Sequence, residues 1–445
     1  MKLDREACAD LFAVNRRRSR EMFDRIRPDA YTARPIPLRN PICFYEGHLP
    51  AFNVNTLVKR GLKAPGIHAE FEILFERGID PEDADSIGNR GLSWPARDEI
   101  LSYAQEADAA IRRALLEGDV ERADNPVLSR GLAVHTVLEH ELMHQETLFY
   151  MFHRLPYGKK IRPAGAPDPL VDGEPPLRET VRVPAGMATL GADRDRVAFG
   201  WDNEFPAHAV AVPEFEIDVH DVTNADYREF VEAGGYGRRE LWDEEGWVWL
   251  EDSGTRHPLF WERREGVWFW RGMHELVPLP AAWPVYVSQA EASAYARWEG
   301  RRLPTEAEYH RAAFGTPDGS ERAHPWGEEP PDPTRGNFDF QRLDPVPAGS
   351  FPAGRSAWGI HDLVGNGWEW TSSVFAPFPG FEPMPSYPVY STDFFDGKHF
   401  VLKGASPATA RELLRPSLRN WFRGNYPYLY ATFRCAQSSD DRMIG

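Results

Sequence analysis

The feature that most constrains the fold is a change in the spacing of apolar residues at residues 158–176. Before this stretch, apolar residues recur at spacings of three and four, which is typical of amphipathic helices. The stretch itself is rich in Pro and Gly and has no periodicity. Beyond it, short apolar pieces such as 181–183 and 209–212 are broken by Gly, Pro and Asp. This change therefore predicts a helical domain, a linker and an irregular α+β domain.

The periodic segments locate the expected elements. Besides an N-terminal helix, we expect helices at 49–62, at 96–117 between Pro95 and Gly118, and at 127–153. Short connections between them favour a four-helix bundle. The predicted domains are a bundle at 1–160, a linker at 161–177 and an α+β domain at 178–445.

Two helix starts are expected inside the α+β domain. One lies near Ser288 and the other near Thr305, where Thr305 and Glu308 have the spacing of a capping box. Most other segments of this domain are too short and too often interrupted for long helices.

Composition and charge narrow the class of function. Two domains suit a chain of 445 residues, and its formal net charge of −17 argues against nucleic acid or an anionic membrane as the main partner. The chain lacks both an apolar signal core and an apolar run of the roughly 18 residues that span a bilayer. We therefore expect a cytoplasmic protein with a small-molecule substrate. Its 3 cysteines are far apart, which predicts that any metal is bound by His or carboxylate.

The sharpest chemical signal is the pair His140 and His144 in the last predicted bundle helix. Residues four apart lie on one helix face, so two imidazoles can share one metal ion. Neutral imidazole suits Zn, Fe, Cu and Ni alike. His48 follows a glycine where another bundle helix is expected to begin, and it can face the same core. Together the three histidines would form a site with open positions for substrate and O2.

The same segment allows a different class of enzyme. His140-Glu-Leu-Met-His144 matches H-E-x-x-H, in which Glu141 would be the general base of a zinc hydrolase. Such hydrolases usually take a third ligand downstream, where His153 is the nearest histidine. The upstream position of His48 favours the open three-histidine site. A third possibility is a binding protein whose histidines are vestigial.

Four sequence motifs in the second half resemble those of a known family: Val222–Phe230, Arg301–Glu308, Gly365–Thr371 and Phe433–Ala436. They resemble the formylglycine-generating-enzyme fold, a variant of the C-type lectin fold, over about residues 178–438. The first half resembles the DinB-type bundle of the ergothioneine-pathway sulfoxide synthases. The resemblance implies Fe(II) on His48, His140 and His144, and an O2-dependent coupling of a thiol to C2 of hercynine (trimethylhistidine) that yields a sulfoxide.

The resemblance also implies roles for other residues. Tyr387 and Tyr390 are similar to the active-site tyrosines of the family, one of which supplies a proton and an electron. Asn420 and Trp421 match the segment that holds hercynine, where the amide would bond the substrate and the indole would attract its quaternary ammonium. Formylglycine-generating enzymes themselves use paired cysteines to hold copper, and only Cys435 lies in this module. That activity is therefore not expected.

Departures from the family pattern concern the sulfur donor. Phe422, Arg423 and Tyr426 stand where enzymes that use γ-glutamylcysteine carry the charged residues that bind the dipeptide. We therefore favour free cysteine as the donor, with Phe422 lining its site and Arg423 binding its carboxylate. Met143 occupies a place where ergothioneine enzymes often carry Gln.

Resemblance to two related families leaves more than one pair of substrates possible. Segments 44–48, 75–78 and 420–428 are similar to the ovothiol-pathway 5-histidylcysteine sulfoxide synthase, which implies histidine as a second candidate beside hercynine. Selenoneine synthase, with a selenosugar donor, has a similar architecture. The expected partners are therefore hercynine or histidine together with a thiol or selenol donor.

Overall fold

The chain forms two compact units in the computed structural model, which describes residues 2–76 and 94–438. One unit comprises Met1–Ala166 together with Pro383–Tyr390, and the other comprises Pro167–Glu382 with Ser391–Gly445. The first is helical and the second is α+β, which confirms the predicted fold class. Positions 77 and 78 of the 75–78 segment lie outside the described residues.

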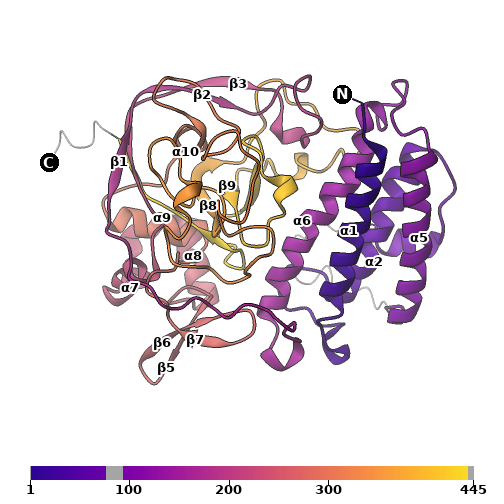
Figure 1. Ribbon diagram of the computed structural model, residues 1–445. Helices are drawn as coiled ribbons and strands as arrows, with labels where there is room; N and C mark the ends of the chain where they lie inside the picture. Colours follow the sequence, from indigo (N-terminus) through magenta and orange to yellow (C-terminus); the bar gives the residue numbers. More distant parts are fainter. Residues whose placement is uncertain (1, 77–93, 439–445) are drawn as a thin grey trace. The chain divides into compact units, whose positions relative to one another are not determined.

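The first unit is a bundle of long helices that lie side by side (Figure 1). Its helices are α1 (Arg5–Phe23), α2 (Ile42–Asn53), the short α3 (Ala69–Leu74), α5 (Arg97–Glu117) and α6 (Leu132–Arg154). Helix α2 contacts α5 and α6, while α1 packs on the same two helices.

The boundaries of α5 and α6 follow from local chemistry. The Glu99 carboxylate accepts a hydrogen bond from the Ala96 N–H at 2.8 Å, and α5 ends before Gly118, as predicted. Helix α6 begins five residues later than expected, because Arg130 and Gly131 have φ of 57° and 70°. These left-handed conformations cannot belong to an α-helix.

The prediction for α2 was wrong in its boundaries. Helix α2 begins at Ile42 rather than near 49, and a π-helical segment at Val54–Gly61 continues it. Every residue of α2 is buried, so the helix has no polar face and its sequence shows no amphipathic period. His48 therefore lies in the middle of the helix rather than at its start.

The second unit contains four small sheets, with hydrogen-bonded orders β1-β4-β12, β2-β3, β5-β6-β7 and β10-β9-β8-β11 among the described residues. The strands are β1 (Thr180–Val183), β2 (Gly186–Leu190), β3 (His208–Val212), β4 (Phe215–Asp218), β5 (Trp261–Arg264), β6 (Val267–Arg271), β7 (Leu276–Pro278), β8 (Gly367–Val374), β9 (His399–Ala405), β10 (Asn420–Arg423), β11 (Ala431–Thr432) and β12 (Ala436–Ser438).

The helices of this unit are α7 (Asn224–Glu232), α8 (Glu244–Ser253), α9 (Gln289–Trp298) and α10 (Glu306–Phe314). Both predicted starts are confirmed, since Ser288 and Thr305 are the N-caps of α9 and α10. Helix α10 packs against β8 and β9 (Figure 1). Within residues 2–76 and 94–438, no helix is both long and apolar enough to cross a bilayer.

Candidate metal centre

Three histidines converge inside the bundle. His140 and His144 lie one turn apart on α6, and His48 reaches them from α2. One ring nitrogen from each lies within 4.8 Å of the others, and His48 Nε2 is 3.3 Å from His140 Nε2. The structure thus brings together the three histidines that the sequence singled out.

Burial keeps these imidazoles neutral. It lowers the pKa of His48 to about 4, and a hydrogen bond with the Phe75 carbonyl opposes this only in part. The pKa values of His140 and His144 are also lowered, first by burial and then by the neighbouring histidines. Near pH 7 all three rings therefore have a lone pair to offer, which is the form of imidazole that binds metals.

Aromatic rings hold two of these imidazoles in place. Phe44 stacks on His48 with centroids 5.2 Å apart and an interplanar angle of 15°. Phe52 stacks on His140 at 3.4 Å and 9°. Phe44 and Phe52 precede and follow His48 by four positions, so their place on its helix face could have been recognised from sequence.

The cluster has the chemistry of a transition-metal site. His140 Nδ1 and His144 Nδ1 are buried and have no hydrogen-bond partner in the described part of the chain. The ring nitrogens that face one another, as His48 Nε2 and His140 Nε2 do at 3.3 Å, are the ones that a shared ion would bind. Three neutral imidazoles within ligand distance fit one metal ion, although they do not by themselves select which.

The segment with the two tyrosines belongs to the same unit. The Ser386 and Thr136 hydroxyls share a hydrogen bond of 2.8 Å that ties Pro383–Tyr390 to α6. The Tyr387 ring lies 6.4 Å from that of His140. The Tyr390 hydroxyl instead donates to Met143 Sδ at 3.3 Å. Tyr387 is therefore the tyrosine placed against the histidine cluster.

Glu141 does not face the histidines. Its carboxylate accepts hydrogen bonds from Arg16 Nη1 at 2.9 Å and from Ser19 Oγ at 2.6 Å, both on α1. Glu141 is 1% exposed and forms a buried ion pair with Arg16. A general base must reach the water or substrate at the metal, so this arrangement disfavours the zinc-hydrolase interpretation.

The expected substrate-binding residues lie on β10 in the second unit. Asn420, Trp421 and Phe422 are half-buried, and Arg423 is exposed. Trp421 stacks on Phe375 with centroids 4.3 Å apart and an interplanar angle of 3°. Phe375 thus covers one face of the indole, and the Phe394 ring lies 5.7 Å from it at an angle of 54°.

A buried charge network, which the sequence analysis missed, leads into β10. Arg419 is 3% exposed, and its guanidinium donates to both oxygens of Glu306 at 2.9 and 3.1 Å. The Lys403 ammonium donates to the carbonyls of Pro416 and Leu418 at 2.8 and 2.6 Å. The network fixes the backbone immediately before Asn420. Its partners come from distant parts of the chain, and no local spacing signals them.

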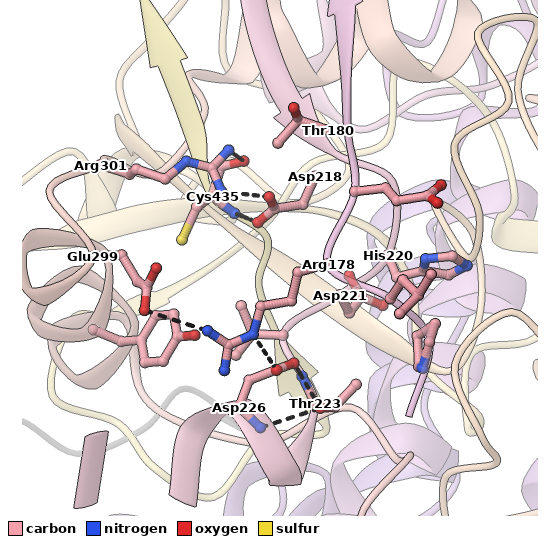
Figure 2. A pocket seen from close by; sticks show the side chains of 15 residues that line it. Arg178, Thr180, Asp218, His220, Asp221, Thr223, Asp226, Glu299, Arg301 and Cys435 are labelled. Atoms are coloured by element: carbon pink, nitrogen blue, oxygen red, sulfur yellow. Dashed lines mark hydrogen bonds and ion pairs between the residues drawn. The ribbon is translucent and has the colours of Figure 1, made fainter. Parts of the chain in front are cut away.

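A pocket of about 220 Å³ elsewhere in the second unit contains none of the predicted site residues (Figure 2). Arg178 pairs with Asp226 and with Glu299, and Arg301 pairs with Asp218. Because these charged groups already satisfy one another, the pocket is a weaker candidate for chemistry than the histidine cluster.

Both halves of the chain match known protein families. Residues 11–148 match the model of the DinB superfamily, and residues 167–439 match the sulfatase-modifying factor enzyme 1-like domain. A hercynine oxygenase of Mycolicibacterium smegmatis is 40% identical over 430 residues, which cover 94% of this chain and 95% of the relative. One from Mycobacterium tuberculosis is 41% identical over 66% of this chain and 67% of the relative. Ergothioneine biosynthesis protein 1 of Neurospora crassa is 30% identical over 90% of this chain and 54% of its own length.

Proposed function

This chain belongs to the hercynine oxygenase family, and we propose that it is an iron-dependent hercynine oxygenase of ergothioneine biosynthesis. It joins a sulfur donor to the imidazole of hercynine with O2 as co-substrate. The observation that carries the proposal is the convergence of three neutral histidines in a chain related to hercynine oxygenases over nearly its full length.

His48, His140 and His144 would hold the ion, and their neutral charge leaves a ferrous site with a net positive charge that attracts a thiolate. When bound, Fe(II) supplies the activation of O2 and a position for the sulfur donor. Phe44 and Phe52 exclude water from one side of the cluster, because their rings cover His48 and His140.

We assign proton delivery to the Tyr387 hydroxyl. The support is that its ring lies near His140, whereas Tyr390 donates its proton to Met143 Sδ. A phenolic O–H can donate a proton as well as a hydrogen bond. Tyr387→Phe should reduce turnover and leave metal binding unchanged, with Tyr390→Phe as the matched control.

We assign hercynine binding to Asn420 and Trp421. The Asn420 amide nitrogen can donate to the substrate carboxylate or imidazole, while its oxygen accepts from the Trp421 N–H at 2.9 Å. The indole of Trp421 would attract the trimethylammonium group by a cation–π interaction. The Arg419–Glu306 pair supports this role, because it immobilises the residue next to Asn420.

The sulfur donor we propose is free cysteine. Phe422 stacks on Tyr426 with centroids 5.1 Å apart, so this surface offers aromatic rings where a γ-glutamyl group would need charges. A charged group without a partner costs about 1–3 kcal/mol, so cysteine should outperform γ-glutamylcysteine by roughly tenfold to a hundredfold. Arg423, which is exposed, is left to bind the cysteine carboxylate. Arg423→Ala should raise the KM for the thiol and leave that for hercynine unchanged.

The test is anaerobic Fe(II) reconstitution followed by exposure to air with hercynine or histidine. Each would be offered with cysteine, γ-glutamylcysteine or a selenosugar, and the products analysed by mass. A sulfoxide from hercynine and cysteine is expected. Product only from histidine or only from the selenosugar would reassign the substrate, and O2-independent turnover with zinc would overturn the proposal.

A further inference from the structure

The protonation of His48 is fixed by one hydrogen bond. His48 Nδ1 lies 2.7 Å from the Phe75 carbonyl oxygen, and both residues are fully buried. A carbonyl oxygen can only accept, so Nδ1 must carry the proton. The lone pair is then on Nε2, which is the atom 3.3 Å from His140 Nε2. The contact therefore directs the metal-binding nitrogen of His48 into the cluster.

The Phe75 carbonyl is available because a helix ends there. Helix α3 ends at Leu74, and Phe75 is its C-cap with φ −102° and ψ 12°. The last carbonyls of a helix have no partner within it, so they accept from elsewhere. The start of α3 is held in turn, since the buried Glu72 carboxylate accepts from the His68 N–H at 3.0 Å and from the Lys59 ammonium at 2.9 Å.

Gly47 is what allows Phe75 to come this close. A Cβ at Gly47 would lie 2.5 Å from Phe75 Cε2 and 2.6 Å from Cζ, well inside contact distance. Helix interiors ordinarily favour alanine over glycine, and Gly47 lies inside α2. The Phe75 ring also packs against Phe44 and Trp94, with centroids 6.0 and 6.2 Å apart, so a side chain at this position would displace the residue as a whole, and its carbonyl with it, from His48.

We infer that Gly47 is a positioning residue of the metal centre: by admitting the Phe75 ring against α2, it sets the tautomer and orientation of His48. The metal-affinity part of this inference rests on the proposed function, whereas the tautomer does not. It also links segment 44–48 to Phe75, which the sequence places in a separate motif. Partners that orient a ligand histidine typically change metal affinity by about 10- to 100-fold when lost.

The first test is a Co(II) titration of Gly47→Ala without oxygen. Affinity should fall by about 10- to 100-fold. Gly61→Ala is the matched control, because a Cβ there would also meet a side chain, Leu128 Cδ2 at 2.8 Å, but at the far end of the π-helical segment. The control should bind Co(II) like the wild type. Adding Phe75→Leu to Gly47→Ala removes the ring atoms that the new Cβ would meet first, and should restore part of the affinity.

The second test reads the tautomer directly in the metal-free protein. With ¹⁵N-labelled histidine, NMR should show His48 protonated at Nδ1 in the wild type and in Gly61→Ala, and a mixture of tautomers in Gly47→Ala. Wild-type affinity in Gly47→Ala, or protonation at Nε2 in the wild type, would overturn the inference. Failure of the wild type to bind any metal would instead refute the proposed function, while the NMR result would still decide the role of Gly47.

Discussion

The histidine cluster of the bundle and the charge network around Arg434 in the second unit bury their polar groups in opposite ways. In the bundle, the histidine cluster has neutral rings, aromatic neighbours and two ring nitrogens with no partner in the described residues. In the second unit, the buried charges around Arg434 are paired with one another. The fully buried Arg434 donates to Glu369 at 2.6 and 2.8 Å and to Asp221 at 3.0 Å.

This difference distinguishes the metal-binding site from the charge network that stabilises the fold. Paired charges hold loops together, since each satisfies the other and leaves no capacity for a ligand. Neutral imidazoles keep a lone pair that a metal ion can bind. Changes in the second unit should therefore affect stability or substrate binding, and changes in the cluster should affect metal binding.

The largest effect on stability is expected from Arg434→Met. It leaves Glu369 and Asp221 buried without their cation, and breaking a buried ion pair costs about 3–5 kcal/mol. Urea unfolding measures the loss. Arg182→Met is the control, because Arg182 is 62% exposed and its ion pairs are long, so its loss should stay within about 0.5 kcal/mol. Equal stability of the two variants would show that the buried charge network does not stabilise the fold.

A smaller, functional effect is expected from Arg419→Lys. Lysine cannot reproduce the two-pronged bond to Glu306, so the backbone before Asn420 should loosen. The KM for hercynine should rise about tenfold, which corresponds to the loss of one charged hydrogen bond, while metal affinity stays unchanged. Arg411→Lys, which alters an exposed ion pair with Asp339, is the control. A change in metal affinity, rather than in KM, would contradict the claim that changes in the second unit leave metal binding unaffected.

The smallest effect is expected from Glu141→Gln. Glutamine keeps an acceptor for Ser19 and Arg16, so metal affinity and turnover should remain within about twofold of the wild type. A zinc hydrolase would lose about 100- to 10,000-fold in rate without its general base. Steady-state rates therefore distinguish the two interpretations. A large loss of rate in Glu141→Gln would favour the zinc-hydrolase interpretation.

Local patterns made much of this predictable. The spacing of His140 and His144, the caps at Ser288 and Thr305 and the end of α5 at Gly118 are encoded within a few residues, and the structure confirms them. The extent of α2 was not predictable in this way, because complete burial removes the polar face on which periodicity depends.

The remaining features depend on contacts between distant residues. Glu141 matches a hydrolase motif, yet its partner Arg16 lies 125 positions away. Ser386 and Thr136, which join the tyrosine segment to the bundle, are 250 positions apart. The acceptor for His48 is a backbone carbonyl, which every residue possesses, so no residue type could signal it.

The central claim is that His48, His140 and His144 hold one ferrous ion that makes the chain consume O2. The most direct test measures Fe(II) per chain after anaerobic reconstitution of the wild type and of each His→Ala variant, followed by O2 uptake with hercynine and cysteine. We predict about one Fe(II) per wild-type chain, and loss of both iron and O2 uptake in every variant, because two imidazoles leave the ion under-coordinated. Stoichiometric iron in the variants, or turnover with zinc and no O2 uptake, would contradict the account.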